Sequence, residues 1–210
     1  DPVEAAIILA EAGFGVADEH STISTREARR ARQVLIQSDP EPAQAVASEP
    51  KWPRAKKAQT VHLLDAETVI KIHKALTDEF RGTPDAVEPP GVKDRGNLES
   101  ALARPHMARV KYHTVPLAAA AILHGLNSNH AFHNGNKRTS LLSVAIFIEN
   151  CNHLYLEGDA DELFDLVVST ASHTLLTDED SPGRSADPWW DDREVLAIHQ
   201  RLRPMITTPE

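Results

Sequence analysis

Apolar residues recur along most of this chain at the three- and four-residue spacing of helices that bury one face. From residue 60 onward the pattern predicts helices over 65–76, 98–104, 116–129, 139–151, 160–172 and 192–203. The helix over 139–151 is apolar nearly all round, which is typical of a buried central helix. Apart from a short extended stretch at 111–114, no segment alternates as a strand does. The predicted fold class is mainly α.

Residues 81–96 separate the first two of these helices and are predicted to form one long surface loop. The segment holds five residues that favour turns: Gly82, Pro84, Pro89, Pro90 and Gly91. Asp65 and Asn97 are the capping residues expected at the starts of the two flanking helices. A loop of this length inside a compact domain is usually functional.

Composition divides the chain into four parts. Residues 1–37 are expected to form an N-terminal helical extension, with a capping box at 24–27, and residues 38–58 a linker rich in Pro, Ala, Glu and Lys. Residues 59–180 form the predicted main domain, and residues 181–210 an acidic segment with a final helix. A DNA contact through residues 1–37 is an alternative, which the nearly equal numbers of acidic and basic residues in 1–60 disfavour.

The overall charge and the cysteine content argue against several classes of protein. The net charge is −9, whereas nucleic-acid-binding proteins normally carry a basic footprint. A single cysteine, Cys151, excludes an internal disulfide framework and a multi-cysteine zinc site. No apolar run is long enough to span a bilayer, and the first residues lack the basic start of a signal peptide. We therefore expect a cytoplasmic protein with neither a membrane nor a nucleic-acid partner.

The candidate chemistry lies between the predicted helices that end near residue 129 and begin near residue 136. This stretch reads His130-Ala131-Phe132-His133-Asn134-Gly135-Asn136-Lys137-Arg138. Lys137 and Arg138 stand where the helix dipole is positive, which costs roughly 0.3–1 kcal/mol per cation. A bound anion reverses the sign, because the amides after Gly135 and both cations then converge on it. The pattern predicts a cradle for phosphate.

His130 is the candidate general base beside this cradle. Histidine is the side chain best suited to take a hydroxyl proton near neutral pH, and a tight loop brings His130 close to the bound anion. A cradle with a base beside it is the minimal equipment for phosphoryl or nucleotidyl transfer. A metal site of His130, His133 and His124 is an alternative, which the lack of a suitably spaced carboxylate or cysteine disfavours.

The stretch from His130 to Thr139 resembles the Fic/Doc signature, H-x-F-x-(D/E)-(G/A)-N-(G/K)-R. Its ending Lys-Arg-Thr is similar to the death-on-curing (Doc) branch, as are the upstream segments 91–94 (GVKD) and 98–105 (LESALARP). The resemblance covers about residues 60–178 and implies a Fic/Doc-type helical bundle with a flap loop. It implies that His130 deprotonates a target hydroxyl. It also implies a phosphate-binding set of Gly135, Asn136, Lys137 and Arg138, and a flap that docks the target strand through Val92, Lys93 and Asp94.

Two departures from the family pattern bear on the reaction. Asn134 replaces the carboxylate that the family uses for Mg²⁺, so it is either a weak metal ligand or a loop-capping amide. The second arginine of the AMP-transferring members falls at Leu141. Together with Lys137 in place of glycine, this loss favours phosphoryl transfer from ATP over AMP transfer, with Mg²⁺ as the implied metal. A catalytically weakened nucleotide-binding interaction module is the remaining alternative.

The resemblance also implies partners for the chain. It implies a Doc-like toxin that modifies a Ser or Thr hydroxyl of a cytoplasmic protein, for example a translation factor. Many relatives silence themselves with an inhibitory motif, [S/T]-x-x-x-E-[G/N]. No Ser or Thr in this chain has a glutamate four residues further on. Control by a separate antitoxin protein in trans is therefore expected.

Overall fold

The computed structural model describes residues 48–53, 60–107, 111–177, 184 and 187–209, and these residues form a mainly helical fold. Its helices are α3 (Ala66–Glu79), α4 (Arg95–Met107), α5 (Val115–Ser128), α6 (Asn136–Ile146), α7 (Ala160–Ser172) and α8 (Trp190–Leu202). A π-helical turn, Phe147–Cys151, follows α6, and a 3-10 turn, Arg203–Met205, follows α8. The predicted fold class is confirmed. The extension predicted over 1–37 and most of the predicted linker lie outside the described residues.

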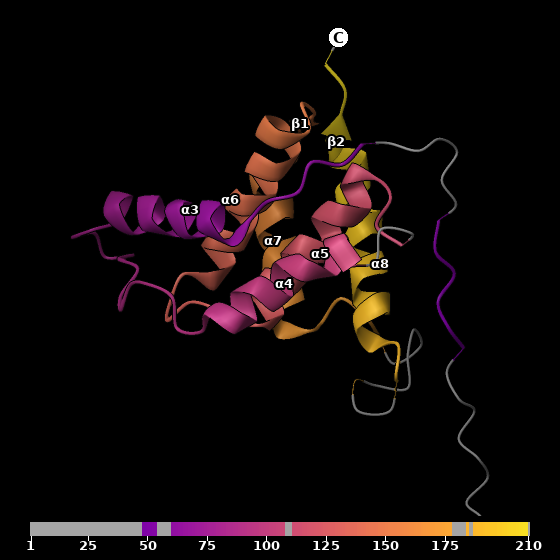
Figure 1. The fold of residues 1–210 in the computed structure, drawn as a ribbon, viewed down its shortest axis with the longest axis horizontal. Helices are drawn as coiled ribbons and strands as arrows, with labels where there is room; N and C mark the ends of the chain where they lie inside the picture. The colour runs from indigo at the N-terminus through magenta and orange to yellow at the C-terminus, as the bar shows by residue number, and fades with distance from the viewer. Residues whose placement is uncertain (1–47, 54–59, 108–110, 178–183, 185–186, 210) are drawn as a thin grey trace, which may run out of the picture. The chain divides into compact units, whose positions relative to one another are not determined.

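Helix α5 is the buried helix around which the others pack (Figure 1). Every residue from Val115 to Asn127 except Pro116 is buried, and α4, α6, α7 and α8 all contact the helix. Its alanine run at 118–121 keeps the helix narrow. At Gly125 an added Cβ would lie only 2.8 Å from the carbonyl oxygen of Ala101 in α4. Small side chains therefore let neighbouring helices approach α5 closely from several sides.

The prediction of a buried central helix over 139–151 was wrong in two respects. Helix α6 begins at Asn136, ends at Ile146 and passes into the π-helical turn. It buries only part of its surface, and Leu141 and Leu142 are half-buried. The central position belongs to α5, which is apolar along most of its length, whereas α6 begins with Asn136, Lys137 and Arg138 and carries further polar residues.

Capping residues set where α3 and α4 begin. Asp65 caps α3 as predicted, and its carboxylate accepts a hydrogen bond of 2.7 Å from the backbone N–H of Thr68. Helix α4 begins at Arg95, earlier than predicted, because Asp94 rather than Asn97 accepts the first-turn hydrogen bond, from the N–H of Asn97 at 2.9 Å. The side chain of Asn97 instead donates to the carbonyl oxygen of Asn129 at 3.1 Å, which ties the start of α4 to the end of α5.

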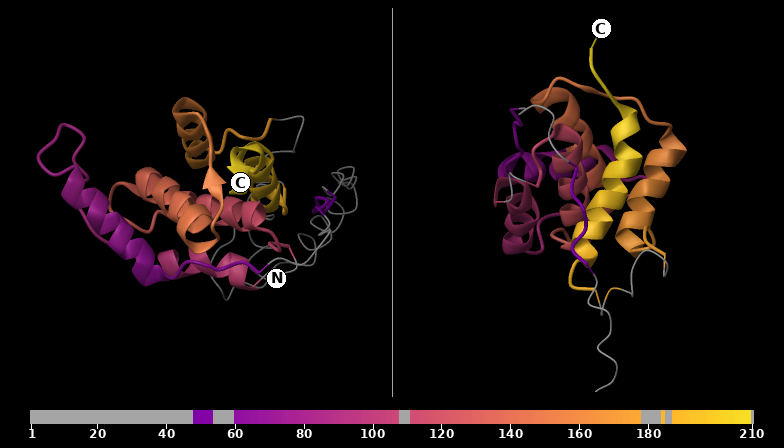
Figure 2. Two further views of the ribbon diagram at one scale, coloured as in Figure 1. Left: turned by 90° about the horizontal axis from the view of Figure 1, so that it is seen from above. Right: turned by 90° about the vertical axis from the view of Figure 1, so that its right-hand side faces the viewer.

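The C-terminal part of the chain completes the bundle. Helix α7 has the predicted bounds, α8 begins two residues before the predicted start, and the two helices lie side by side (Figure 2). Strands β1 (Tyr155–Leu156) and β2 (Ile206–Thr207) pair antiparallel, with Tyr155 opposite Thr207. Two-residue strands are too short to show alternation, so the sequence did not predict them. Residues 111–114 form no strand; Thr114 instead caps α5.

Residues 48–53, which belong to the predicted linker, lie against the helical bundle. The carbonyl oxygen of Ser48 accepts a hydrogen bond of 2.6 Å from the Arg193 guanidinium in α8. The Trp52 ring meets Tyr112 edge-on, with ring centroids 5.4 Å apart. Lys111 lies over the same tryptophan ring, 5.1 Å from its centroid. Aromatic and cation–π contacts therefore hold this short segment in place.

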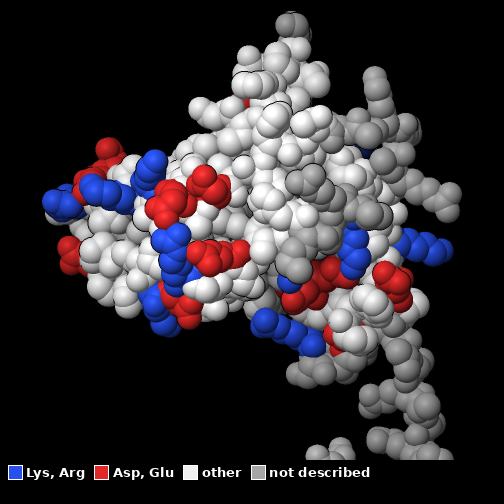
Figure 3. All heavy atoms as spheres, viewed as in Figure 1, with Lys and Arg blue, Asp and Glu red and all other residues white. Residues whose placement is uncertain are grey.

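Charges of both signs are interspersed on the face shown in Figure 3. Arg95, for example, bonds to both Glu67 and Glu99 at 2.8 Å. On this face the described residues form no continuous basic surface of the kind that nucleic acid requires. Among the described residues, no helix is long and apolar enough to cross a membrane.

Candidate functional site

The loop between α5 and α6, residues 129–135, borders a pocket of about 460 Å³. We call this segment the α5–α6 loop, and residues 80–94, which join α3 to α4, the flap. The pocket is lined by His130, by every residue from His133 to Arg138, and by Pro84, Asp85 and Ala86 of the flap. The structure therefore brings the predicted base and the predicted phosphate-binding residues into one pocket.

His130 marks the point where the chain leaves α5. It follows the C-cap residue Asn129 and has a left-handed backbone conformation, with φ of 47°. Non-glycine residues are uncommon in this region, although histidine is among the types enriched there. The turn leaves the imidazole exposed in the pocket, whereas Ala131 and Phe132 directly after it are buried. An exposed imidazole next to a buried anchor suits a proton acceptor that must reach a target.

Asn136 closes the α5–α6 loop upon itself. Its Oδ1 accepts a hydrogen bond of 3.0 Å from the N–H of Phe132, and its Nδ2 donates one of 2.9 Å to the carbonyl oxygen of Phe132. The carboxamide thus engages Phe132 through one acceptor and one donor. The main-chain N–H of Asn136 and its second Nδ2 hydrogen can still face a phosphate.

Gly135 allows the tight entry into α6. It has a left-handed backbone conformation, with φ of 71°, and an added Cβ would lie 2.7 Å from a methyl group of Val87 in the flap. Both the conformation and the lack of space require glycine. As a result, Val87 of the flap packs directly against Gly135.

The start of α6 has the properties of an anion site. Gly135 offers no side-chain cap, and the first turn contains no acidic residue. Within the described part of the chain, the N–H groups of residues 136–138 find no hydrogen-bond acceptor. Lys137 is exposed and forms no ion pair with a described residue. Free amides, the positive end of the dipole and a free ammonium group together favour a phosphate at this point.

Arg138 connects α6 to the flap. Its guanidinium donates a hydrogen bond of 2.6 Å to the carbonyl oxygen of Asp85 and lies 4.7 Å from the ring centroid of Phe80. The carboxylate of Asp85 is 3.9 Å away and largely exposed. The guanidinium thus joins the start of α6 to the flap, and Arg138 also lines the pocket.

Asn134 acts as a tether for the α5–α6 loop. Its Oδ1 accepts a hydrogen bond of 2.7 Å from the N–H of Gly135, and its Nδ2 donates one of 2.7 Å to the carbonyl oxygen of Glu88 in the flap. Of the two roles that the sequence leaves open, the structure shows the capping amide. The same oxygen keeps a second lone pair, and as a neutral amide oxygen it is a weaker ligand for a hard cation than a carboxylate.

The predicted docking residues of the flap pair with the α5–α6 loop. Val92 and Phe132 face each other in an antiparallel bridge. The N–H groups of Lys93 and Asp94 donate to the carbonyl oxygen of Ala131 at 2.8 and 3.1 Å, and the N–H of His133 donates to Gly91 at 3.1 Å. In this pattern the N–H and C=O of Val92 point away from the α5–α6 loop. The outer edge of the flap at Val92 therefore offers one donor and one acceptor to a further strand.

Two polar residues that the sequence reasoning missed border this region. Asn127, near the end of α5, is buried and lines the pocket; its Nδ2 donates to Leu123 and Ser140, while its Oδ1 has no partner among the described residues. His73 in α3 lies behind the α5–α6 loop and contacts it together with the flap. The only signal for Asn127 was a polar residue near the end of an apolar helical stretch, and the only signal for His73 was its place among the apolar positions of α3.

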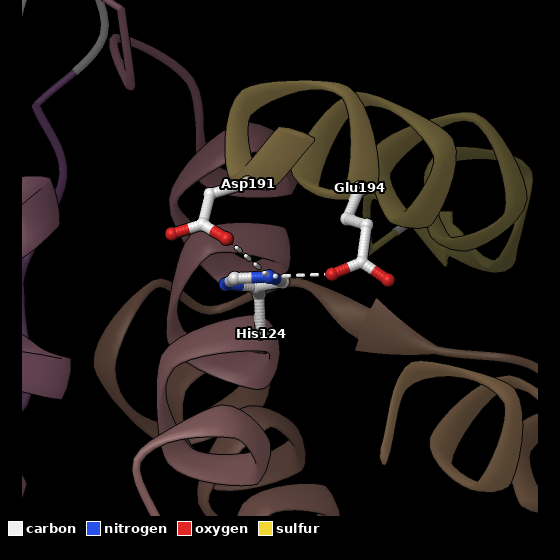
Figure 4. Close-up of side chains that lie close together, drawn as sticks. All are labelled: His124, Asp191 and Glu194. Carbon is white, nitrogen blue, oxygen red and sulfur yellow. Dashed lines mark hydrogen bonds and ion pairs between the residues drawn. The ribbon is translucent and has the colours of Figure 1, made fainter. Parts of the chain in front are cut away.

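His124 belongs to a different cluster from the one that the sequence alternative envisaged (Figure 4). Its Nε2 lies 3.0 Å from Glu194 and 3.9 Å from Asp191, and these three residues are the only group with metal-ligand spacing in the described part of the chain. The Arg104 guanidinium faces Nδ1 of the same ring at 3.1 Å. Because a guanidinium only donates, Nδ1 is unprotonated and Nε2 carries the proton that bonds to Glu194.

This cluster is satisfied without a metal ion. Glu194 is fully buried and also accepts from Nδ1 of His173 at 2.8 Å. Burial alone raises the pKa of the Glu194 carboxyl, but the hydrogen bonds from His124 and His173 outweigh burial and hold that pKa below its usual value. The cluster ties α5, α7 and α8 together as an ion network.

The fold and the pocket define a class: a helical protein in which an uncapped, cationic helix start and an exposed histidine border the same pocket. Residues 63–148 match the model of a family described as Fic/DOC. The match spans α3 to α6 with the flap and the α5–α6 loop, and it supports assignment of this segment to the Fic/DOC family. Members of that family are typically transferases that act on proteins. No curated protein matches the chain.

Proposed function

We propose that this protein transfers the γ-phosphoryl group of a nucleoside triphosphate, ATP, to a Ser or Thr hydroxyl of a cytoplasmic protein. The observation that carries the proposal is the start of α6, where free amides, Lys137 and Arg138 border the same pocket as His130. The volume of the pocket, about 460 Å³, lies within the range of ligand-binding sites. The pocket can therefore hold the phosphates of a nucleotide.

The chemistry assigns one role to each part of the pocket. His130 takes the proton of the target hydroxyl while the hydroxyl oxygen of the target forms a bond to the γ-phosphorus. The bond from that phosphorus to the bridging oxygen breaks, and the nucleoside diphosphate leaves with the electron pair. The α6 amides, Lys137 and Arg138 stabilise the charge on the phosphate oxygens. The proton on His130 is then released to solvent.

Leu141 supports phosphoryl transfer over AMP transfer. It lies one turn into α6 and packs against the hydrophobic core instead of lining the pocket. Lys137 and Arg138 are the only Lys or Arg residues among the described residues that line the pocket. A second arginine on the α-phosphate side, which AMP transfer uses in the family, has no counterpart at this position.

Mg²⁺ is proposed to be held mainly by the nucleotide phosphates and by water. The Asn134 oxygen, which accepts from Gly135, is neutral, so its contribution to the ion is weak. The free Oδ1 of Asn127 is buried at the same pocket and is a suitable acceptor for a water of the hydration shell. When bound, the ion neutralises charge between the phosphates.

The target is proposed to dock as an extended strand along the flap at Val92. The outward N–H and C=O of that residue can pair with one residue of the target, while Lys93 and Asp94 keep the flap bonded to Ala131. Such pairing recognises the main chain of the target and not its side chains. The amino-acid sequence of the target around the modified hydroxyl is therefore only loosely specified.

In the cell the protein is proposed to act as a Doc-like toxin, controlled by an antitoxin in trans, with a translation factor as a suitable target. The absence of the inhibitory motif from the sequence supports control by a second protein. Expression of the full chain alone is expected to stop growth, and His130→Ala is expected to restore it. Harmless expression of the folded wild type would contradict the toxin role.

The decisive experiment uses ATP labelled at either the γ- or the α-phosphate with a cytoplasmic extract. Phosphoryl transfer leaves only the γ label on protein, and His130→Ala removes it. Retention of the α label would identify AMP transfer instead. Nucleotide binding without transfer of either label, by a chain whose fold is intact, would identify a binding module.

A further inference from the structure

His73 in α3 lies where three parts of the site meet. Its side chain is buried, with 3% of the residue exposed. Its ring stacks on Phe132 of the α5–α6 loop, with centroids 4.1 Å apart and planes 20° apart. Nε2 lies 3.1 Å from the N–H of Gly91 in the flap, and Nδ1 lies 3.0 Å from Oγ1 of Thr139 in α6. One imidazole therefore touches the flap, the α5–α6 loop and the phosphate-binding helix.

The partners of His73 determine its protonation state. A backbone N–H can only donate, so Nε2 must accept the hydrogen bond from Gly91 and carries no proton. Nδ1 then carries the proton and donates it to Thr139. Burial lowers the pKa of His73, which keeps the ring neutral at neutral pH. The ring thus has one acceptor and one donor, and both are used.

Both backbone polar groups of Gly91, the N–H and the carbonyl oxygen, are hydrogen-bonded. Its N–H donates to His73, and its carbonyl oxygen accepts from the N–H of His133 at 3.1 Å. Its φ of +97° is a conformation that glycine adopts readily and other residues do not. Val92, whose outer edge is free for a strand, follows directly. The bond from His73 therefore fixes the start of the short pairing between the flap and the α5–α6 loop.

We propose that His73 is a positioning residue that keeps the flap in register with the α5–α6 loop and so sets the distance between a docked strand and His130. The register itself is a property of the free protein. Its consequence for the docked target rests on the proposed function.

Three substitutions separate the contributions of the ring. His73→Phe keeps the buried volume and the stacking on Phe132 but removes both hydrogen bonds. His73→Gln places a carboxamide oxygen near the position of Nε2, where it can still accept from Gly91. Lys74→Ala, next in sequence and exposed, is the matched control.

The first test is hydrogen exchange of backbone amides in the full chain without nucleotide or target. His73→Phe is expected to lower the protection of the Lys93 and His133 amides about tenfold, as expected for loss of a buried hydrogen bond, while the amides of α5 keep theirs. His73→Gln and Lys74→Ala are expected to resemble the wild type. Unchanged protection in His73→Phe, or an equal loss throughout α5, would overturn the proposal.

The second test measures transfer to the target protein. His73→Phe is expected to raise the KM for the target about tenfold and leave the dissociation constant of ATP unchanged, and His73→Gln is expected to restore the KM. A rise in the ATP dissociation constant with an unchanged KM for the target would refute the positioning role. If the wild type labels no protein at all, the proposed function fails, while the exchange experiment still decides the register.

Discussion

Asn136 holds Phe132 by two hydrogen bonds, accepting from its N–H at 3.0 Å and donating to its carbonyl oxygen at 2.9 Å. The first residue of α6 therefore folds the α5–α6 loop back, and Phe132 carries this restraint to His73, on which it stacks. The start of α6, which is the proposed phosphate cradle, is thus bonded directly to the segment that bears His130, and fixed relative positions are the condition for catalysis by positioning.

Asn136→Ala removes both bonds and leaves the N–H and C=O of Phe132 unpaired beside the core. We expect the free energy of unfolding to fall by roughly 1–3 kcal/mol, measured by urea denaturation. Asn97→Ala, which removes one amide hydrogen bond, from Nδ2 to the carbonyl oxygen of Asn129, at an exposed position, is the control and should lower it less. Equal losses in the two variants would show that the α5–α6 loop does not depend on Asn136.

His130→Gln should remove the general base without disturbing the cradle. We expect kcat for transfer to fall roughly 10²–10⁴-fold, while ATP binding, measured by calorimetry, stays within twofold, roughly, of the wild type. The matched control is His133→Gln. That side chain is exposed in the same pocket, and only its backbone N–H bonds to the flap. A similar loss in both variants would assign the proton transfer elsewhere.

Asn134→Asp restores the carboxylate of the family pattern. Aspartate can still accept from the N–H of Gly135, and it gains a charge that Mg²⁺ favours, but it loses the donor to Glu88. We expect the Mg²⁺ concentration for half-maximal transfer to fall about tenfold. Asn129→Asp, which lies outside the pocket lining, should leave it unchanged. No response to Asn134→Asp would place the ion away from this residue.

Gly125→Ala tests the close crossing of α4 and α5. The new Cβ would meet the carbonyl oxygen of Ala101 at 2.8 Å, so the helices must separate. We expect a loss of roughly 1–3 kcal/mol in the free energy of unfolding. Because the obstacle is backbone, Ala101→Gly in the same chain should not recover the loss. Recovery in the double variant would show that the methyl group of Ala101 was the obstacle.

Acid should destabilise the fold through His73. Burial lowers the pKa of His73 below 6.5, so between that lowered pKa and pH 6.5 the unfolded chain binds more protons than the folded one. The free energy of unfolding therefore falls as the pH drops through this window. Burial is the cause of the lowered pKa of His73. The charged groups Glu88 and Arg138 do not offset it, because Glu88 is exposed and Arg138 faces Phe80 and Asp85.

Denaturation at pH 7 and at lower pH in wild type and His73→Gln isolates this contribution. His199 is also buried with a lowered pKa, and its effect is common to both proteins. We expect the wild type to lose more stability than His73→Gln on acidification. Parallel losses would show that His73 is not the group that titrates.

The local sequence was sufficient to predict a helix start where the residue that determines it lies within one helical turn of that start. Asp65 caps α3, α7 has the predicted bounds, and α6 begins at Asn136 with Lys137 and Arg138 in its first turn. The start of α4 was predicted less well. Asp94 and Asn97 are both good caps, and the choice between them depends on Asn129, far along the chain, which engages the side chain of Asn97.

The sequence by itself determined the helical class, and it predicted anion-binding chemistry at the start of α6 with a histidine beside it. These features follow from residue types and spacings within a few residues. Only the tertiary structure decided that His73 holds the flap at Gly91, that Asn134 ties Gly135 to Glu88, and that Glu194 joins two histidines. Each of these depends on hydrogen-bond partners that are far apart in the chain, and a polar side chain shows its partner only once packing has brought the two together.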